Sequence, residues 1–132
     1  MVRLIIVLLL ATALFTVAGL EQHFIQSAYG RLEGDTTVLI ARLRETPDDT
    51  PIDTDENKEL IDHMFAYWLR YERRLTMLAR HFDLSLVSDA IIYAKNFIHF
   101  DNKEEAMAGL LRLEYLIKTH SFNMGTSIQN VI

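Results

Sequence analysis

The sequence predicts an all-α protein with a single N-terminal transmembrane helix followed by a small antiparallel helical bundle. The first observation behind this prediction is an uncharged run of seventeen residues, 4–20, directly after Arg3. The second is that apolar residues recur at helical spacing in three later segments. The third is that the chain has only five Gly and two Pro, and no β-strand pattern of useful length.

The apolar run predicts a membrane anchor at residues 1–20. As a helix the run is about 25 Å long, close to the ~30 Å hydrocarbon core of a bilayer. A snorkelling Arg3 extends it. A cleaved signal peptide, with small residues at 17–19, and a buried core helix are the alternatives. Helical apolar spacing favours an uncleaved anchor because it continues past Leu20 through Phe24, Ala28 and Leu32.

Charge around the apolar run predicts its orientation. Arg3 precedes the run and Glu21 follows it, so the N-terminus is expected in the cytoplasm. The expected location is therefore the cell membrane, with a single pass and the bulk of the chain extracytoplasmic.

Composition limits the classes of protein that fit. Half of the 132 residues are hydrophobic, which is enough for one small domain with a core of its own. The net charge of −5 disfavours binding to nucleic acid. The absence of cysteine excludes disulfides, thiol catalysis and thiolate metal sites.

The segment after the anchor divides into two parts. Residues 21–45 are expected to form a juxtamembrane helical segment that breaks at Gly34 and Asp35, with Asp35 capping a short helix at 36–45. Residues 46–54 form an acidic loop that contains both prolines, Pro47 and Pro51, and this loop is the clearest break in the chain.

Residues 55–121 are expected to form the bundle, with helices at about 55–81, 84–99 and 102–120 and an irregular tail at 122–132. Asp53 with Glu56, and Asp101 with Glu104, match the capping-box pattern at the start of two of these helices. The short second connection predicts a helical hairpin. The expected core stripes consist of these residues: Ile61, Met64, Phe65, Trp68, Tyr71, Leu75, Ala79, Phe82, Val87, Ala90, Ile91, Ala94, Phe97, Ile98, Ala106, Leu110, Leu113, Leu116 and Ile117.

Several of these features resemble a family of small membrane-anchored bacterial proteins catalogued as domain of unknown function 4363. The resemblance covers almost the whole chain, from the anchor and the Gly-Asp pair to the helical domain. It implies a membrane-anchored helical fold and carries over no functional residue, because the family has no established activity. The matching residues are Trp68, the segments 81–83 and 101–106, and Ser127, Asn130, Val131 and Ile132.

The residues do not form a motif typical of an enzyme or a metal site. His63 and His81 lie roughly 27 Å apart along one helix, so they are too distant to share an ion. The pair of Glu59 and His63 offers two ligands, whereas a zinc site takes three or four. No serine lies in a G-x-S-x-G elbow. We therefore expect no cofactor, no metal site and no enzymatic activity.

Two surfaces are candidates for interaction. Arg70, Arg73 and Arg74 form a basic patch beside Tyr67 and Tyr71, suited either to a phosphate headgroup or acidic partner, or to a solvated face paired with nearby acids.

The second surface is an apolar patch of Ala108, Leu111 and Tyr115, opposite the main stripe of the last helix. Either the juxtamembrane helix or a partner should cover it.

The sequence favours a non-enzymatic accessory or interaction subunit of a membrane protein, with a protein partner or a second copy of itself. The alternative is a ligand-sensing bundle whose interior binds a small apolar molecule. An apolar cavity between helices would favour sensing, and an exposed apolar face would favour interaction. An enzyme is a distant third.

Overall fold

The structure, a computed structural model, describes the backbone of residues 1–75 and 81–129 and the side chains of residues 1–75 and 83–120. It contains four helices: α1 at Val2–Glu45, α2 at Asp55–Leu75, α3 at His81–His99 and α4 at Lys103–Gln129. The described residues include no strand. The predicted all-α class is confirmed.

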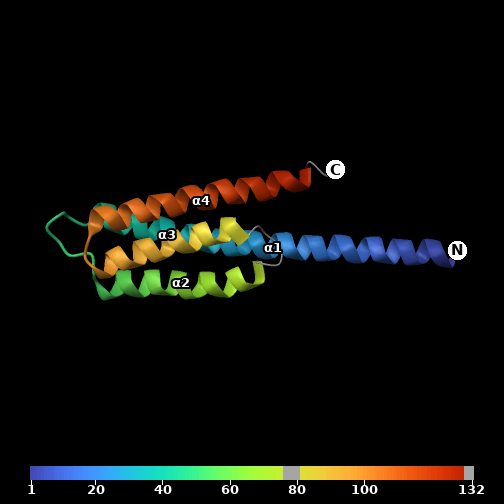
Figure 1. Cartoon of the computed structure of the whole chain (residues 1–132), viewed down its shortest axis with the longest axis horizontal. Helices are drawn as coiled ribbons and strands as arrows, with labels where there is room; N and C mark the ends of the chain where they lie inside the picture. The colour runs from blue at the N-terminus through green and yellow to red at the C-terminus, as the bar shows by residue number, and fades with distance from the viewer. Residues whose placement is uncertain (76–80, 130–132) are drawn as a thin grey trace.

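The four helices form an antiparallel bundle in which each runs opposite to the next (Figure 1). Helix α1 packs against α2 and α4, and α3 packs against the same two helices from the opposite corner. The α4 helix therefore runs back toward the end of the bundle from which the N-terminal part of α1 projects (Figure 1).

Helix α1 continues without interruption from Val2 to Glu45, so the predicted break at Gly34 and Asp35 is wrong. The reason is burial on both sides of the glycine: Leu32 and Thr36 are buried against the other helices. The Thr36 hydroxyl also donates to the Leu32 carbonyl oxygen at 2.7 Å. Packing of this stripe outweighs the roughly 1 kcal/mol that a glycine costs within a helix.

The second half of α1 is the fourth helix of the bundle and not a separate juxtamembrane segment. Its buried residues are Ala28, Tyr29, Leu32, Thr36, Leu39, Ile40 and Leu43. The domain of the protein therefore begins well before residue 55, because the three helices from 55 onward need α1 to close their core.

The first half of α1 projects beyond the bundle and makes no buried contact there (Figure 1). By length and composition α1 is the one helix among the described residues that could cross a membrane, and none of its apolar window is buried. Thr12 and Thr16 satisfy their hydroxyl groups within the helix, each donating to a carbonyl oxygen four residues earlier at 2.8 Å. The polar atoms of this segment are therefore compatible with hydrocarbon.

The core confirms the predicted stripes on α2, α3 and α4 for the side chains that the structure describes, whereas Ala79 and Phe82 lie outside that part. Trp68 is fully buried, and its indole N–H donates to the Ser88 hydroxyl at 2.9 Å. The Ser88 hydroxyl in turn donates to the Leu84 carbonyl oxygen at 3.2 Å. Phe65 and Tyr71 lie at the edge of the core and are partly buried.

Both predicted capping residues are displaced by one position. Thr54, not Asp53, caps α2, because its hydroxyl accepts from the Asn57 N–H at 3.3 Å. Asn102, not Asp101, caps α4 and accepts from the Glu105 N–H at 3.1 Å. In each case two successive residues could serve as caps, and the helix start decides between them.

Asp101 instead lies at the C-terminal end of α3 and closes that helix. Its φ of 54° lies in the left-handed region, and it is the one such non-glycine residue in the described chain. The Asn102 N–H bonds the Phe97 carbonyl oxygen at 2.9 Å, and the Asp101 N–H bonds that of Ile98 at 3.2 Å. This is the Schellman pattern that closes a helix C-terminus.

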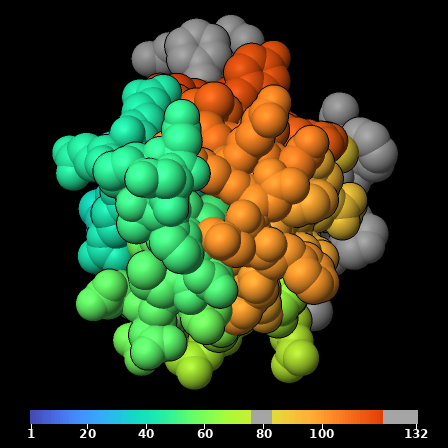
Figure 2. Space-filling view, turned by 90° about the vertical axis from the view of Figure 1, so that its left-hand side faces the viewer, coloured from blue at the N-terminus to red at the C-terminus, as the bar shows by residue number. Residues whose placement is uncertain are grey.

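The predicted loop at 46–54 is confirmed and is fastened to the α3–α4 turn at the end of the bundle remote from the apolar segment (Figure 2). The Lys103 ammonium donates to the Thr46 carbonyl oxygen at 2.6 Å and to the Asp48 carboxylate at 2.9 Å. This hydrogen bond and the Lys103 charge lower the pKa of Asp48.

Two helix limits differ from those predicted. Helix α3 begins at His81 rather than residue 84, whereas residues 76–80 lie outside the described chain. Helix α4 continues to Gln129, so an irregular tail at 122–132 is wrong for residues 122–129. No proline or charged residue interrupts this stretch, and Gly125 alone does not stop a helix.

Candidate functional site

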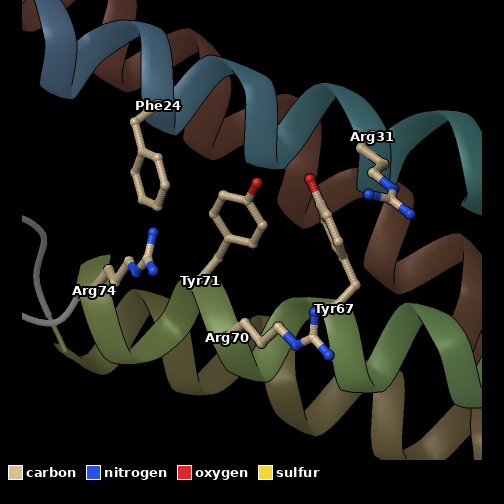
Figure 3. A pocket seen from close by; sticks show the side chains of 6 residues that line it. All are labelled: Phe24, Arg31, Tyr67, Arg70, Tyr71 and Arg74. Carbon is tan, nitrogen blue, oxygen red and sulfur yellow. The ribbon is translucent and has the colours of Figure 1, made fainter.

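A pocket of about 250 Å³ lies between α1 and α2, near the point where α1 leaves the bundle (Figure 3). We call it the arginine groove. Phe24 and Arg31 reach into it from α1, and two tyrosines and two arginines reach into it from α2 (Figure 3). Its lining residues are Phe24, Arg31, Tyr67, Arg70, Tyr71 and Arg74.

Aromatic rings form the floor of the arginine groove. Phe24 stacks on Tyr71 with ring centroids 4.7 Å apart and an interplanar angle of 30°. Tyr71 in turn lies against Tyr67 at 4.6 Å. Such pairs add about 0.5–1.5 kcal/mol each beyond the area they bury, so they join α1 to α2 firmly at this level.

Two guanidinium groups are held by these rings. The Arg31 guanidinium lies 4.1 Å from the centre of the Tyr67 ring, and that of Arg74 lies 5.9 Å from the centre of the Phe24 ring. Arg31 also donates to Nε2 of His63 at 3.4 Å. Stacking on a ring face positions an arginine and leaves its N–H groups directed at other acceptors.

Tyr67 supplies a hydroxyl that stays protonated. Burial raises its pKa to about 12, with a further contribution from the hydrogen bond to Tyr71, although Arg31 opposes the rise. The hydroxyl approaches the Ser27 carbonyl oxygen at 3.5 Å, a long contact. The groove therefore combines the protonated phenol of Tyr67 with three guanidinium groups.

The arginine groove lacks carboxylates. All 18 acidic residues of the chain fall within its described part. Within that part, no carboxylate lies within 4.0 Å of the guanidinium groups of Arg31, Arg70 or Arg74. Three cations thus share a small pocket in a chain whose net charge is −5.

The predicted basic patch is only partly brought together in this groove. Arg70 and Arg74 line it, because they are four residues apart on one face of α2. Arg73 is exposed and does not line it. Sequence reasoning placed Tyr67 and Tyr71 beside the patch but missed Phe24 and Arg31, which belong to the segment assigned to a separate juxtamembrane helix.

The predicted apolar patch lies on the outer face of α4. Tyr115 is 67% exposed and Leu111 is 40% exposed, and Ala108 is exposed beside them. Helix α1 packs elsewhere on α4 and does not cover these side chains. Of the two occupants predicted for this patch, the structure therefore excludes the juxtamembrane helix.

Two of the described histidines, His63 and His99, make pairwise polar contacts, whereas Nδ1 of buried His120 has no hydrogen-bond partner. Nε2 of His99 lies 3.0 Å from Oδ1 of Asp62, which Lys95 also approaches at 3.6 Å. In the part of the chain that the structure describes, no three side chains of His, Asp or Glu are grouped to hold a metal ion. His81 was a candidate ligand, and its side chain lies outside the described residues.

Comparisons with known proteins identify no relative. No family model, no curated protein sequence and no solved structure matches this chain. Membership of the family catalogued as domain of unknown function 4363 therefore stays a prediction.

Proposed function

We propose that this protein is a membrane-anchored accessory subunit that acts by contacting another protein of the same membrane. Residues 4–20 of α1 remain attached and span the bilayer once, and the bundle stands on the extracytoplasmic side. Arg3 supports this orientation because positive charge favours the cytoplasmic side. The bundle carries out no reaction of its own.

The exposed apolar patch of Ala108, Leu111 and Tyr115 is the observation that supports this proposal most directly. These side chains lie on the outer face of α4, where a solvated helix normally carries charge. Tyrosine is enriched at the centre of protein interfaces, so Tyr115 is the side chain of this patch that best fits a contact with another protein.

The form of α1 supports a partner in the same membrane. The apolar segment and the first bundle helix are one helix with no linker between them. The bundle is therefore held at a fixed height and angle above the bilayer. A fixed surface suits a partner that is also fixed in the membrane, because less orientational freedom is lost when the two bind.

The alternative of a bundle that senses a small apolar molecule has less support. Such a sensor needs a cavity lined mostly by apolar side chains. The arginine groove has three guanidinium groups and two phenols among its six lining residues, so its chemistry suits an anion instead.

Exchange of Leu111 and Tyr115 for glutamate tests the proposal. The double variant should remain folded, because both side chains are exposed, and it should lose the partner that co-purifies with the intact chain from membranes. The control is Val38→Glu on α1, where another apolar side chain is 45% exposed. Retention of every partner by the Leu111/Tyr115 variant would contradict the proposal, as would loss of a partner that is only a second copy of the chain.

A further inference from the structure

We infer that the arginine groove binds the phosphate of an anionic phospholipid headgroup from the membrane that α1 enters. This inference rests on the span assigned to residues 4–20 in the proposed function, but not on the apolar patch of α4. It concerns a different face of the bundle and a different kind of ligand.

The height of the arginine groove above the membrane supports a lipid. Phe24 follows the last residue of the apolar run, Leu20, by four positions, or about 6 Å along a helix. The polar headgroup layer is about 5–8 Å thick on each side of the hydrocarbon core. Phe24 and its neighbour Arg74 therefore lie at the level of the headgroups, whereas Arg31, about 10 Å further along α1, closes the upper end.

The chemistry of the groove matches a phosphate. Guanidinium groups bind phosphate oxygens through paired, charge-assisted hydrogen bonds. The three guanidinium groups come from two helices and line the same pocket.

The lack of carboxylates near the three arginines also supports a bound anion. A carboxylate close to a surface arginine would offset its charge, although such exposed pairs contribute little to stability. Here the three cations repel one another, and no acidic side chain of the described chain lies within 4.0 Å to offset the repulsion. A bound anion would remove this repulsion, so the arrangement favours the bound state.

The size of the groove also agrees with a headgroup. Its volume of about 250 Å³ is below the roughly 300–1,000 Å³ of pockets that enclose drug-sized molecules. A phosphate with part of its glycerol fits such a space while the acyl chains remain in the bilayer. The rings of Phe24 and Tyr71 would border the glycerol, where aromatic side chains are common in membrane proteins.

The test is native mass spectrometry of the full chain, purified in a mild detergent with equal amounts of phosphatidylcholine and phosphatidylglycerol. The intact chain should retain phosphatidylglycerol in preference to phosphatidylcholine. Exchange of Arg70 and Arg74 for glutamine should lower this retention at least about tenfold, because two charge-assisted contacts are lost. Arg31→Gln, on the opposite wall of the groove, should also lower the retention of phosphatidylglycerol. This variant tests the site if the Arg70/Arg74 variant does not fold.

The matched control is the exchange of Arg42 and Arg44 for glutamine. It removes the same charge from exposed positions at the other end of α1 and should leave retention within about twofold. Equal losses in both double variants would contradict a built site and indicate general surface charge. Equal retention of the two lipids, or unchanged retention in the Arg70/Arg74 variant, would also contradict it.

Two further outcomes separate this inference from its alternatives. A large excess of inorganic phosphate should not displace the lipid, and displacement by phosphate would identify a site for free phosphate instead. The unbound mass reports on the span, because a chain that keeps residues 1–20 weighs 15.3 kDa. A smaller mass contradicts the span itself, whereas an intact chain that retains no phosphatidylglycerol contradicts only the groove.

Discussion

The Ile52 N–H donates to Oδ1 of Asp101 at 2.7 Å, across 49 positions of sequence. The contact joins the loop between α1 and α2 to the turn between α3 and α4. Ile52 is buried, and its carbonyl oxygen accepts from the side-chain amide of Asn57 at 3.0 Å. One aspartate thus ends a helix with its backbone and fixes a distant loop with its side chain.

Replacement of Asp101 should separate these two tasks. Asp101→Asn keeps a side-chain acceptor and tolerates the left-handed conformation. We therefore expect the free energy of unfolding to fall by no more than about 0.5 kcal/mol. Asp101→Gly keeps the left-handed conformation but not the acceptor, and its free energy of unfolding should fall by about 1 kcal/mol. Asp101→Ala keeps neither, and its free energy of unfolding should fall by about 2 kcal/mol. Unfolding of the full chain in detergent measures the order. Equal stability of the alanine and asparagine variants would contradict both roles.

Trp68 should be the most costly side chain to truncate in α2. It is fully buried, tilts against Tyr29 with ring centroids 5.4 Å apart, and donates to Ser88. Trp68→Ala should lower the free energy of unfolding by about 3–5 kcal/mol. Leu69→Ala, at an exposed position of the same helix, is the control and should cost much less. Fluorescence of Trp68 typical of water would contradict the packing.

Substitution of alanine for two different glycines should change the stability of the bundle in opposite directions. A Cβ at Gly109 would lie 3.1 Å from the backbone nitrogen of Ala94 and 2.9 Å from the Tyr93 ring, because α3 and α4 approach closely there. Gly109→Ala should therefore destabilise the bundle by about 1–2 kcal/mol. A Cβ at Gly34 meets nothing within 4 Å, so Gly34→Ala should stabilise it by about 0.5–1 kcal/mol. Thermal unfolding compares the two, and a destabilising Gly34→Ala would contradict a continuous α1.

Tyr29 should make the bundle sensitive to alkaline pH. Burial, aided by the charge of Asp83, raises its pKa to about 12, and its hydroxyl has no hydrogen-bond partner. An unfolded tyrosine titrates near pH 10, so the unfolded state loses the proton first. Tyr29 therefore leaves the stability of the bundle independent of pH below about pH 10 and lowers it by about 2–3 kcal/mol between about pH 10 and 12.

Tyr29→Phe should remove this part of the alkaline loss and stabilise the bundle at neutral pH by about 1 kcal/mol, since a buried hydroxyl without a partner is eliminated. The measurement is the free energy of unfolding of the full chain between pH 8 and about pH 12. Tyr115→Phe, at an exposed position, should leave the pH dependence unchanged. An unaltered alkaline slope in Tyr29→Phe would show that another group is responsible.

Periodicity predicts most of this fold because the stripes on α2, α3 and α4 are wide and regular. Trp68, Ile91 and Leu113 are buried as their spacing indicates. The prediction failed at Gly34, where a local break signal competes with burial of Leu32 and Leu39 against helices distant in sequence. Propensity acts locally, whereas those partners lie in α2 and α4.

Because of the same error, the prediction missed two of the six residues that line the arginine groove, Phe24 and Arg31. Arg70 and Arg74 stand out in the sequence because they are close together, but Arg31 lies 39 positions before Arg70 and contributes only if α1 belongs to the bundle. Continuity of helical spacing through Phe24, Ala28 and Leu32 was the available signal. The exposed patch on α4 could be predicted without knowing which helices pack together. Its position opposite the core stripe depends on the spacing of residues within one helix.

We propose that the attached membrane span and the first bundle helix are one rigid helix. Because the chain has no cysteine, spin labels can be placed at Ala13→Cys and Arg42→Cys alone. These exposed positions are 29 residues apart on one face of α1, so pulsed electron resonance of the chain in lipid nanodiscs should give one narrow distance near 44 Å. A short or broad distribution, or the absence of the label at residue 13 after cleavage, would contradict the account.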